Sequence, residues 1–344
     1  MTTPKEHNFF MPAEWHPHTA TWIAWPGLEE AYIDAPGGQI EGMKQAKVCY
    51  GQVAKTIARF ETVNVLACKD AIEEAKAHCG PDVNIVEAVI DDGWIRDSGP
   101  TFVVNDSGEV AGVNWVFNAY GNKYAHENDA KVARFVLDHL KVKYFDCDLV
   151  VEGGGIHVDG EGTVLITENN LLNKNRNPNQ TKADVEKYLN DYIGATKVIW
   201  LNGDIPYDET DGHVDGLACF VRPGVVMTTT TRDKDHPDYE VLKENLEILK
   251  NSTDAKGRKL EIIEIDQPAK YIYTCAMNFY MVNGAVIIPA YNFPEYDKYV
   301  LDLFKKTFTD REVIQLDTGI ILFGGGNIHC ITQQQPAPMP KDTN

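Results

Sequence analysis

The chain has 344 residues, of which 43% are hydrophobic and 24% are charged. This composition supports a large buried core and excludes an intrinsically disordered chain. The 51 Asp and Glu residues outnumber the 32 Lys and Arg residues, which gives a formal net charge of −19 at pH 7. Such a charge argues against binding to nucleic acid or to an anionic membrane, whereas it would concentrate a small cationic ligand near the protein.

Cysteine usage and the N-terminal sequence indicate a cytoplasmic protein. The seven cysteines are spread along the chain without a Cys-x-x-Cys pair, so neither a disulfide framework nor a structural zinc site is predicted. The N-terminus is polar, and no apolar run reaches membrane-spanning length. We therefore expect reduced thiols and no membrane segment. Residues 1–8 and 337–344 are expected to be loose tails.

Between these tails the chain repeats a unit in which two strands are joined by a tight turn and followed by a helix. The predicted hairpins pair 101–104 with 110–115, 156–158 with 163–167, 217–221 with 225–228, and 279–282 with 285–289. Apolar residues at helical spacing predict helices over 42–59, 129–140, 181–193, 239–252 and 295–307. The end segments 21–25 and 327–332 are available to complete a fifth unit.

This repetition predicts a single α/β domain over residues 1–344, built of about five hairpin-plus-helix units around a central axis. An ordinary mixed α/β sheet is the alternative. In a radial arrangement, the segment immediately before each hairpin would lie at one end of the axis. We call these the pre-hairpin segments, and they carry the most polar motifs: 94–100, 152–155, 211–215 and, near the end of the chain, 324–330.

The pre-hairpin segments bring together residues suited to attack on a guanidinium. Asp97 and Asp215 can accept the paired N–H groups of this planar cation. Cys330 is the candidate nucleophile; because an unperturbed thiol has a pKa near ~8.5, a nearby cation must favour the thiolate. His213 would donate a proton to departing ammonia and then activate water, forming and hydrolysing an amidino-thioether. Glu152 would accept from the imidazole and raise its pKa.

A metal site is the rival chemistry, because His157, His213 and His329 each lie close to an Asp or a Cys in the sequence. We expect no metal. A His-x-Asp pair on a strand points both side chains to the same face, and this arrangement serves an acid/base histidine beside a cation-binding carboxylate as well as it serves a metal. His157 and Asp159 open a hairpin turn and are expected to be structural. The remaining cysteines are expected to be core or surface thiols: Cys49, Cys68, Cys79, Cys147, Cys219 and Cys275.

The same motifs resemble those of the agmatine deiminases, or agmatine iminohydrolases, of the guanidine-modifying superfamily. The likeness covers 11–15, 94–100, 152–162, 171–178, 208–215 and the specific run 324–336, Gly-Gly-Gly-Asn-Ile-His-Cys-Ile-Thr-Gln-Gln-Gln-Pro. The resemblance implies a five-bladed, pseudo-symmetric α/β propeller of the pentein type and the same roles for the five site residues. It also implies hydrolysis of agmatine to N-carbamoylputrescine and ammonia, a step of putrescine and polyamine biosynthesis. No cofactor and a homo-oligomer are expected.

Recognition of the substrate tail is less determined by the sequence. Asp91, Asp92 and Trp94 are candidates for contacting a distal ammonium, and Gly325 for contacting the substrate. Arg96, Arg176 and Arg232 are candidates for a carboxylate, as free arginine would require. Gly93, Gly216 and Gly319 depart from the family pattern, so a deiminase of L-arginine or another alkylguanidine stays open. An amidinotransferase, a metal-dependent amidohydrolase and a non-catalytic binding protein of the same fold stay open as well.

Overall fold

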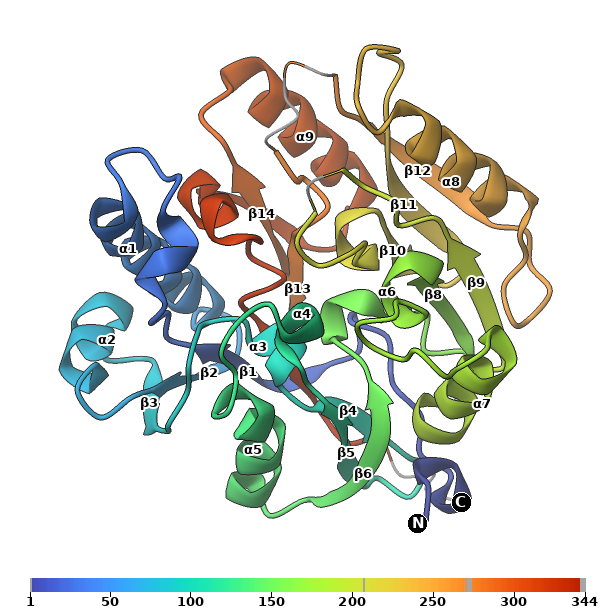
Figure 1. Cartoon of the computed structure of the whole chain (residues 1–344), viewed down its shortest axis with the longest axis horizontal. Helices are drawn as coiled ribbons and strands as arrows, with labels where there is room; N and C mark the ends of the chain where they lie inside the picture. Colours follow the sequence, from blue (N-terminus) through green and yellow to red (C-terminus); the bar gives the residue numbers. More distant parts are fainter. Residues whose placement is uncertain (1, 207, 269, 271–273, 341–344) are drawn as a thin grey trace.

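Five separate β-sheets surround one central region, and the long helices lie at the periphery (Figure 1). The structure, a computed structural model, describes residues 2–206, 208–268, 270 and 274–340. The sheets comprise β4 (Thr101–Val104), β5 (Val110–Val116) and β6 (Lys143–Val150); β7 (His157–Val158), β8 (Thr163–Thr167) and β9 (Lys197–Leu201); β10 (Ala218–Arg222), β11 (Val225–Thr230) and β12 (Glu261–Asp266); β13 (Tyr280–Val282), β14 (Ala285–Ala290) and β15 (Glu312–Asp317); and β16 (Gln333–Pro336), β1 (His18–Ala24), β2 (Thr62–Ala67) and β3 (Asn84–Glu87). The predicted five-bladed α/β propeller is therefore confirmed.

Each blade has the same internal order. The two strands of the hairpin pair antiparallel, and the second strand then pairs parallel with a third strand, as β4, β5 and β6 do. The third strands are absent from the prediction. All except β2, which β3 covers, lie at sheet edges, and β15 has no fully buried residue. An edge strand with charged residues at both ends carries a weak alternation signal.

The fifth blade closes the ring by joining the two ends of the chain. β16 pairs antiparallel with β1, with Gln333 opposite Trp22. The segment 327–332, which was predicted to supply this strand, instead forms turns just before it. Local hydrogen bonds hold those turns, because Asn327 O accepts from the Ile331 amide at 3.2 Å and Ile328 O accepts from the Thr332 hydroxyl at 2.8 Å.

The five predicted helices are confirmed within a few residues. They are α1 (Gln39–Ile57), α5 (Val132–Leu140) with the 3-10 turn η3 (Asp129–Lys131) before it, α7 (Lys182–Ile193), α8 (Tyr239–Asn251) and α9 (Pro294–Thr307), and α2 (Ile72–Cys79) is additional. The start and end of α7 follow from its caps, since Thr181 and Asp184 form a capping box and Gly194 adopts a left-handed conformation. In the part of the chain that the structure describes, no helix has the length and apolar character needed to cross a bilayer.

Part of the N-terminal segment that the sequence analysis expected to be loose is folded. η1 (Pro4–His7) is a 3-10 turn that lies against α7, and Pro4 is buried. After it, the Phe10 amide donates to Val104 O at 2.9 Å. At the other end, the Ala337 amide donates to Pro17 O at 2.7 Å, while residues 341–344 of the predicted tail lie outside the described part of the chain.

Candidate active site

The pre-hairpin segments of all five blades meet at the centre of the molecule. The short helix α3 (Ile95–Ser98) lies against the 3-10 turn η4 (Gly153–Gly155), and η4 lies against the turn η5 (Val214–Gly216). In blade order, the pre-hairpin segments contribute Asp97, Glu152, His213 with Asp215, Asn278 and Cys330. All are at least nine-tenths buried. The five predicted site residues are thus gathered in one place, together with Asn278, which the sequence analysis missed.

The glycines of η4 allow these side chains to approach the backbone. A Cβ atom on Gly154 would lie 2.6 Å from His213 Nδ1 and 3.0 Å from Asp97 Oδ1. A Cβ atom on Gly153 would lie only 2.0 Å from Arg96 O. Such distances are shorter than van der Waals contact allows. These glycines therefore make room for neighbouring pre-hairpin segments.

Cys330 is a buried thiol at the wall of a cavity. Its Sγ accepts a hydrogen bond from Asn278 Nδ2 at 3.1 Å and lies 3.5 Å from Asp215 Oδ2. Asn278 Oδ1 also accepts from the backbone amides of Asn327 and Cys330, at 3.0 and 3.2 Å, and so fixes the turn that presents the thiol. Burial, with the nearby Asp215 and Asp97, raises the pKa of Cys330 well above its usual range. The thiol is therefore neutral until a cation arrives.

His213 lies between two carboxylates and retains one ring N–H without a partner. Its Nε2 is 3.4 Å from Glu152 Oε2, and its Nδ1 is 3.8 Å from Asp97 Oδ1. Among the described residues, Nδ1 has no hydrogen-bond partner. Burial favours the neutral ring, but the facing carboxylates, Asp97 first, outweigh it and raise the pKa of His213 to about 9. The ring is therefore charged at neutral pH, with a proton on Nδ1 available to a ligand.

Glu152 is fully buried and is held by two further side chains. Arg176 Nε donates to Oε1 at 3.0 Å, and Asn170 Nδ2 donates to Oε2 at 3.0 Å. Burial alone would raise the pKa of Glu152, but the hydrogen bond to His213 and the charge of Arg176 lower it. These contacts favour ionised Glu152 as an acceptor for the imidazole of His213. Arg176 and Asn170 were not predicted to support it.

Asp97 and Asp215 lie on either side of His213 and differ in their environments. Asp97 accepts from the Tyr120 hydroxyl and from the Gly154 amide, both at 2.9 Å. Burial, with the charge of Asp215, raises the pKa of Asp97. The pKa of Asp215 is lowered in spite of its burial, because His329 Nδ1 lies 2.8 Å from its Oδ2.

Tyr120 reaches Asp97 from a strained turn. Ala119, Tyr120, Gly121 and Asn122 all have positive φ, with φ 59° and ψ 38° at Tyr120. Such a conformation is uncommon for a bulky residue and marks a position that its surroundings over-determine. The sequence analysis did not identify Tyr120, because a run of left-handed residues has no signal in hydrophobic periodicity.

A cavity of about 250 Å³ leads from Cys330 and Asp97 to an acidic end. Aromatic side chains form much of its wall, and Gly325 also lines it; the aromatic residues are Trp94, Phe117, Tyr120 and Tyr124. The acidic end is lined by Asp91, Asp92, Asp129 and Glu209. Within the described part of the chain, the cavity lining includes no Lys, Arg or His. The cavity therefore suits an elongated molecule with a positive charge at each end.

The acidic end is built from two neighbouring loops that cap each other. Asp129 accepts from the backbone amides of Asp91 and Asp92, and Asp91 accepts from those of Asn128 and Asp129. Burial and the nearby Asp91 carboxylate raise the pKa of Asp129 to about 7. Asp129 therefore binds a proton more readily than an exposed carboxylate does.

The arginines considered for a substrate carboxylate are engaged or distant. Arg96 donates to His329 O and Gln334, and Arg176 is paired with Glu152 and Asp211. Arg232 is exposed and does not line the cavity. None of the three departing glycines, Gly93, Gly216 and Gly319, lines it either. A Cβ on Gly93 would lie 2.6 Å from Tyr50 Oη, so Gly93 accommodates that buried ring.

Comparison with known proteins assigns the chain to a family. The sequence profile of the Porphyromonas-type peptidyl-arginine deiminases matches residues 10–336, which is nearly the whole chain. The chain belongs to this family. Among curated members, it is 42% identical to the agmatine deiminase of Pseudomonas aeruginosa, with 98% of each chain covered, and 41% identical to that of Pseudomonas syringae, again with 98% of each covered.

A solved structure of this deiminase family has the same fold. The agmatine deiminase of Enterococcus faecalis, described as catalysing its reaction, superposes with a TM-score of 0.91 at 35% sequence identity and covers 98% of both chains. The family membership and the fold that the sequence motifs implied are therefore confirmed. The family acts on C–N bonds of guanidines, and this chain is a hydrolase of that class.

Proposed function

We propose that the chain hydrolyses agmatine to N-carbamoylputrescine and ammonia through a covalent amidino-thioether on Cys330. The observation that carries the proposal is that Cys330 and Asp97 line an acidic cavity, while Asp215 lies 3.5 Å from the Cys330 thiol and the charged His213 ring, with an unpartnered N–H, lies 3.8 Å from Asp97. Relatives named for this activity, matched over almost their full length, support the choice of substrate.

Binding of the substrate cation activates the nucleophile. Asp97 and Asp215 accept the N–H groups of the guanidinium and so hold its carbon near Cys330. The added positive charge offsets the carboxylates that keep the thiol neutral, so the thiol pKa falls and its proton is lost to solvent. Asn278, which donates to Sγ, stabilises the resulting thiolate.

The first half of the reaction forms the covalent intermediate. The Cys330 thiolate adds to the guanidinium carbon, and His213 transfers its Nδ1 proton to one terminal nitrogen of the tetrahedral adduct. The C–N bond breaks, ammonia leaves, and a positively charged amidino-thioether remains on Cys330. Glu152, ionised and hydrogen-bonded to Nε2, stabilises the imidazolium before transfer and fixes the ring orientation throughout.

The second half regenerates the enzyme. Neutral His213 accepts a proton from water, and the hydroxide adds to the amidino carbon. Collapse of this adduct breaks the C–S bond, returns the thiolate and leaves a ureido group on the product. The hydroxyl proton of the adduct is released to solvent, where the ammonia freed earlier becomes ammonium. His213 keeps the proton taken from water and is again charged, and the thiolate regains a proton from solvent when the product leaves.

The cavity favours agmatine over free arginine. Agmatine carries an ammonium at the end distant from its guanidinium, and the acidic end of the cavity offers up to four carboxylates to it. Arginine would place its α-carboxylate in the same region, where the described lining has no cation to receive it. Like charges in a partly buried site oppose binding strongly.

We also propose a pathway, a cellular location and an oligomeric state for this enzyme. N-carbamoylputrescine is one carbamoyl group away from putrescine, so the enzyme would act in polyamine biosynthesis. Free thiols at all seven cysteines are consistent with a reducing, cytoplasmic location. A homo-oligomer, implied by the family resemblance, is tested by sedimentation velocity of the purified chain.

The deciding experiment offers agmatine and, separately, L-arginine to chelator-treated protein and follows ammonia and the ureido product, with Cys330→Ser as control. Equal amounts of ammonia and N-carbamoylputrescine from agmatine alone support the proposal. Turnover of arginine alone would contradict the substrate assignment, and activity that returns only with added metal would favour a metal-dependent amidohydrolase. Absence of turnover with tight agmatine binding would favour a binding protein.

A further inference from the structure

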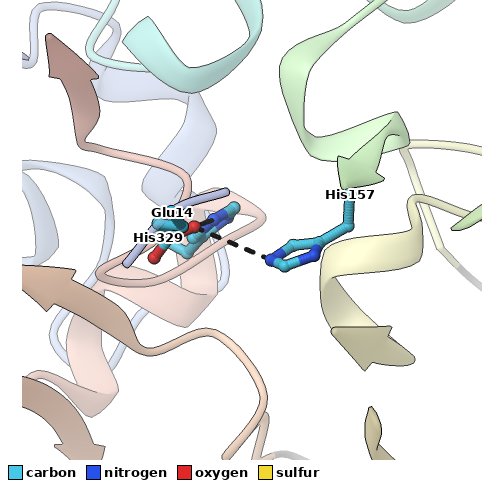
Figure 2. Close-up of side chains that lie close together, drawn as sticks. All are labelled: Glu14, His157 and His329. Atoms are coloured by element: carbon cyan, nitrogen blue, oxygen red, sulfur yellow. Dashed lines mark hydrogen bonds and ion pairs between the residues drawn. The ribbon is translucent and has the colours of Figure 1, made fainter. Parts of the chain in front are cut away.

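Behind Asp215, away from the cavity, a chain of buried polar groups extends to the N-terminal segment. His329 Nδ1 lies 2.8 Å from Asp215 Oδ2, and His329 Nε2 lies 2.9 Å from Glu14 Oε2. Figure 2 shows Glu14 beside His329, with His157 approaching from another blade. All of these side chains are almost fully buried. Neither Glu14 nor His329 lines the cavity that contains Cys330.

The hydrogen bonds determine where the protons are. Both nitrogens of His329 face carboxylate oxygens, which only accept when ionised, so each nitrogen needs a proton. The ring is therefore an imidazolium shared by two carboxylates. The other oxygen of Glu14 accepts from the Met281 amide at 3.0 Å, which fixes the carboxylate in place.

We propose that Glu14 and His329 are positioning residues that hold the Asp215 carboxylate ionised and aimed at the guanidinium. The inference rests on the proposed function, since it concerns how the substrate clamp is kept ready. It extends that function to Glu14, a residue distant in sequence that does not touch the cavity. Removing either charge should weaken Asp215 as a clamp without removing any group that contacts the substrate.

The other charged and titratable groups around this chain do not replace it. Asp215 also faces His213, Asp97, Cys330 and Cys275, while His329 and Glu14 also face Arg96, His157, Cys219 and Tyr280. Burial and Arg96 disfavour a charged ring, but the two flanking carboxylates outweigh them and raise the pKa of His329. Arg96 itself donates to the backbone O of His329 and to Gln334.

A metal centre is the competing interpretation of the same residues, since Glu14, His157 and His329 present ligand atoms within 4.8 Å of one another. Proton placement argues against it. His157 Nδ1 accepts from the Phe220 amide at 3.2 Å, so the single proton of this ring is on Nε2, the atom 3.8 Å from Glu14. Burial lowers the pKa of His157 to about 4, which keeps it neutral. Both rings thus direct N–H groups, not lone pairs, toward Glu14.

The test is the pH profile of kcat/KM for agmatine in the wild type, Glu14→Gln and the matched variant His157→Asn, whose amide can still accept from Phe220. Without the Glu14 charge, His329 loses its proton more readily and Asp215 loses its cation, so the pKa of Asp215 rises. Activity that needs ionised Asp215 is lost as pH falls through that pKa. We expect the acid limb, which the lowered pKa of Asp215 sets, to move up by about one pH unit in Glu14→Gln, with roughly tenfold lower kcat/KM at pH values below the wild-type limb and recovery at pH values above the shifted limb. His157→Asn should keep the wild-type limb.

A second variant and a second readout keep the inference testable. The double variant Glu14→Gln/His329→Asn removes both charges of the Glu14–His329 pair and retains an amide donor toward Asp215, and it should shift the limb in the same direction. Imidazole ¹⁵N shifts should show His329 doubly protonated up to alkaline pH in the wild type and not in Glu14→Gln. An unmoved limb in folded variants, or an equal loss at every pH, would overturn the proposal. Wild-type protein that releases no ammonia while His329 remains doubly protonated would contradict the proposed function alone.

Discussion

The two ends of the cavity hold carboxylates in different ways. At the end with Cys330, Asp97 is fixed by contacts from other parts of the fold, from Tyr120 and from the backbone of η4. At the acidic end, Asp91 and Asp129 are fixed mainly by each other's backbone. The first arrangement depends on the relative placement of several blades, whereas the second is local to two loops.

This difference separates chemistry from recognition. Changes at the reactive end should lower kcat, because they misplace groups that act on the reacting carbon. Changes at the acidic end should raise KM and leave kcat nearly unchanged, because they remove attraction for a distant part of the substrate. Substitutions at the two ends should therefore have distinct kinetic signatures.

The largest effect is expected at the nucleophile. Cys330→Ser should reduce ammonia release from agmatine by at least about a thousandfold, because a hydroxyl is a far weaker nucleophile than a thiolate at neutral pH. The measurement is the initial rate of ammonia formation. Cys68→Ser, at a half-buried thiol outside the cavity, should retain the wild-type rate. A Cys330→Ser enzyme within tenfold of wild type would remove Cys330 from the mechanism.

The next largest effect is expected at a glycine. Gly154→Ala places a methyl group 2.6 Å from His213 Nδ1, so the imidazole must move, and kcat should fall about a hundredfold. Gly216→Ala is the matched control, because its methyl group would meet only Cys275 Sγ, at 3.9 Å. Steady-state kinetics on both variants check this. A similar fall in kcat in both variants would mean that the clash with His213 is not the cause of the loss.

A smaller effect is expected on the alkaline limb of the pH profile. The raised pKa of His213, about 9, keeps its proton available until the pH rises through that value. Glu152→Gln removes a neighbouring negative charge, so the pKa should fall and the alkaline limb of kcat should move down by about one pH unit. Asn170→Ala, which removes a donor to Glu152 but not its charge, should move the limb less. An unchanged limb in Glu152→Gln would assign it to another group.

The smallest effect is expected at the acidic end. Asp91→Asn should raise KM for agmatine about tenfold with little change in kcat, because one charge facing the ammonium is lost. A substrate control sharpens the test, since an alkylguanidine of the same chain length without the terminal amine should bind both enzymes alike. If Asp91→Asn weakens both substrates equally, the acidic end is a structural feature of the loops.

The sequence predicts the fold and the reactive residues better than it predicts their supports. The hairpins and long helices follow from local turn chemistry and periodicity, whereas β15 is an edge strand with a weak alternation of buried and exposed residues. Asn278 was missed although it precedes the fourth hairpin, in a position equivalent to those of Asp97 and Cys330. That equivalence was the signal that could have found it.

Other supports have no local signal. Glu14 contacts His329 across 315 positions of sequence, and its pairing exists only once the blades have assembled. Tyr120 depends on a left-handed turn whose reason, the Asp97 carboxylate, lies in another segment. The reactive residues can be predicted from their residue type and their position before a hairpin. The residues that support them through distant contacts are found only in the folded structure.

Closure of the ring by β1 and β16 has a consequence for biosynthesis. β16 is the last of the described strands to be synthesised, and Cys330 lies in the turns just before it. Until that segment has left the ribosome, the edge of β1 is unpaired and the guanidine site has no thiol. A nascent chain can therefore fold four blades, yet it gains its reactive sulfur and loses its open strand edge in the same late step.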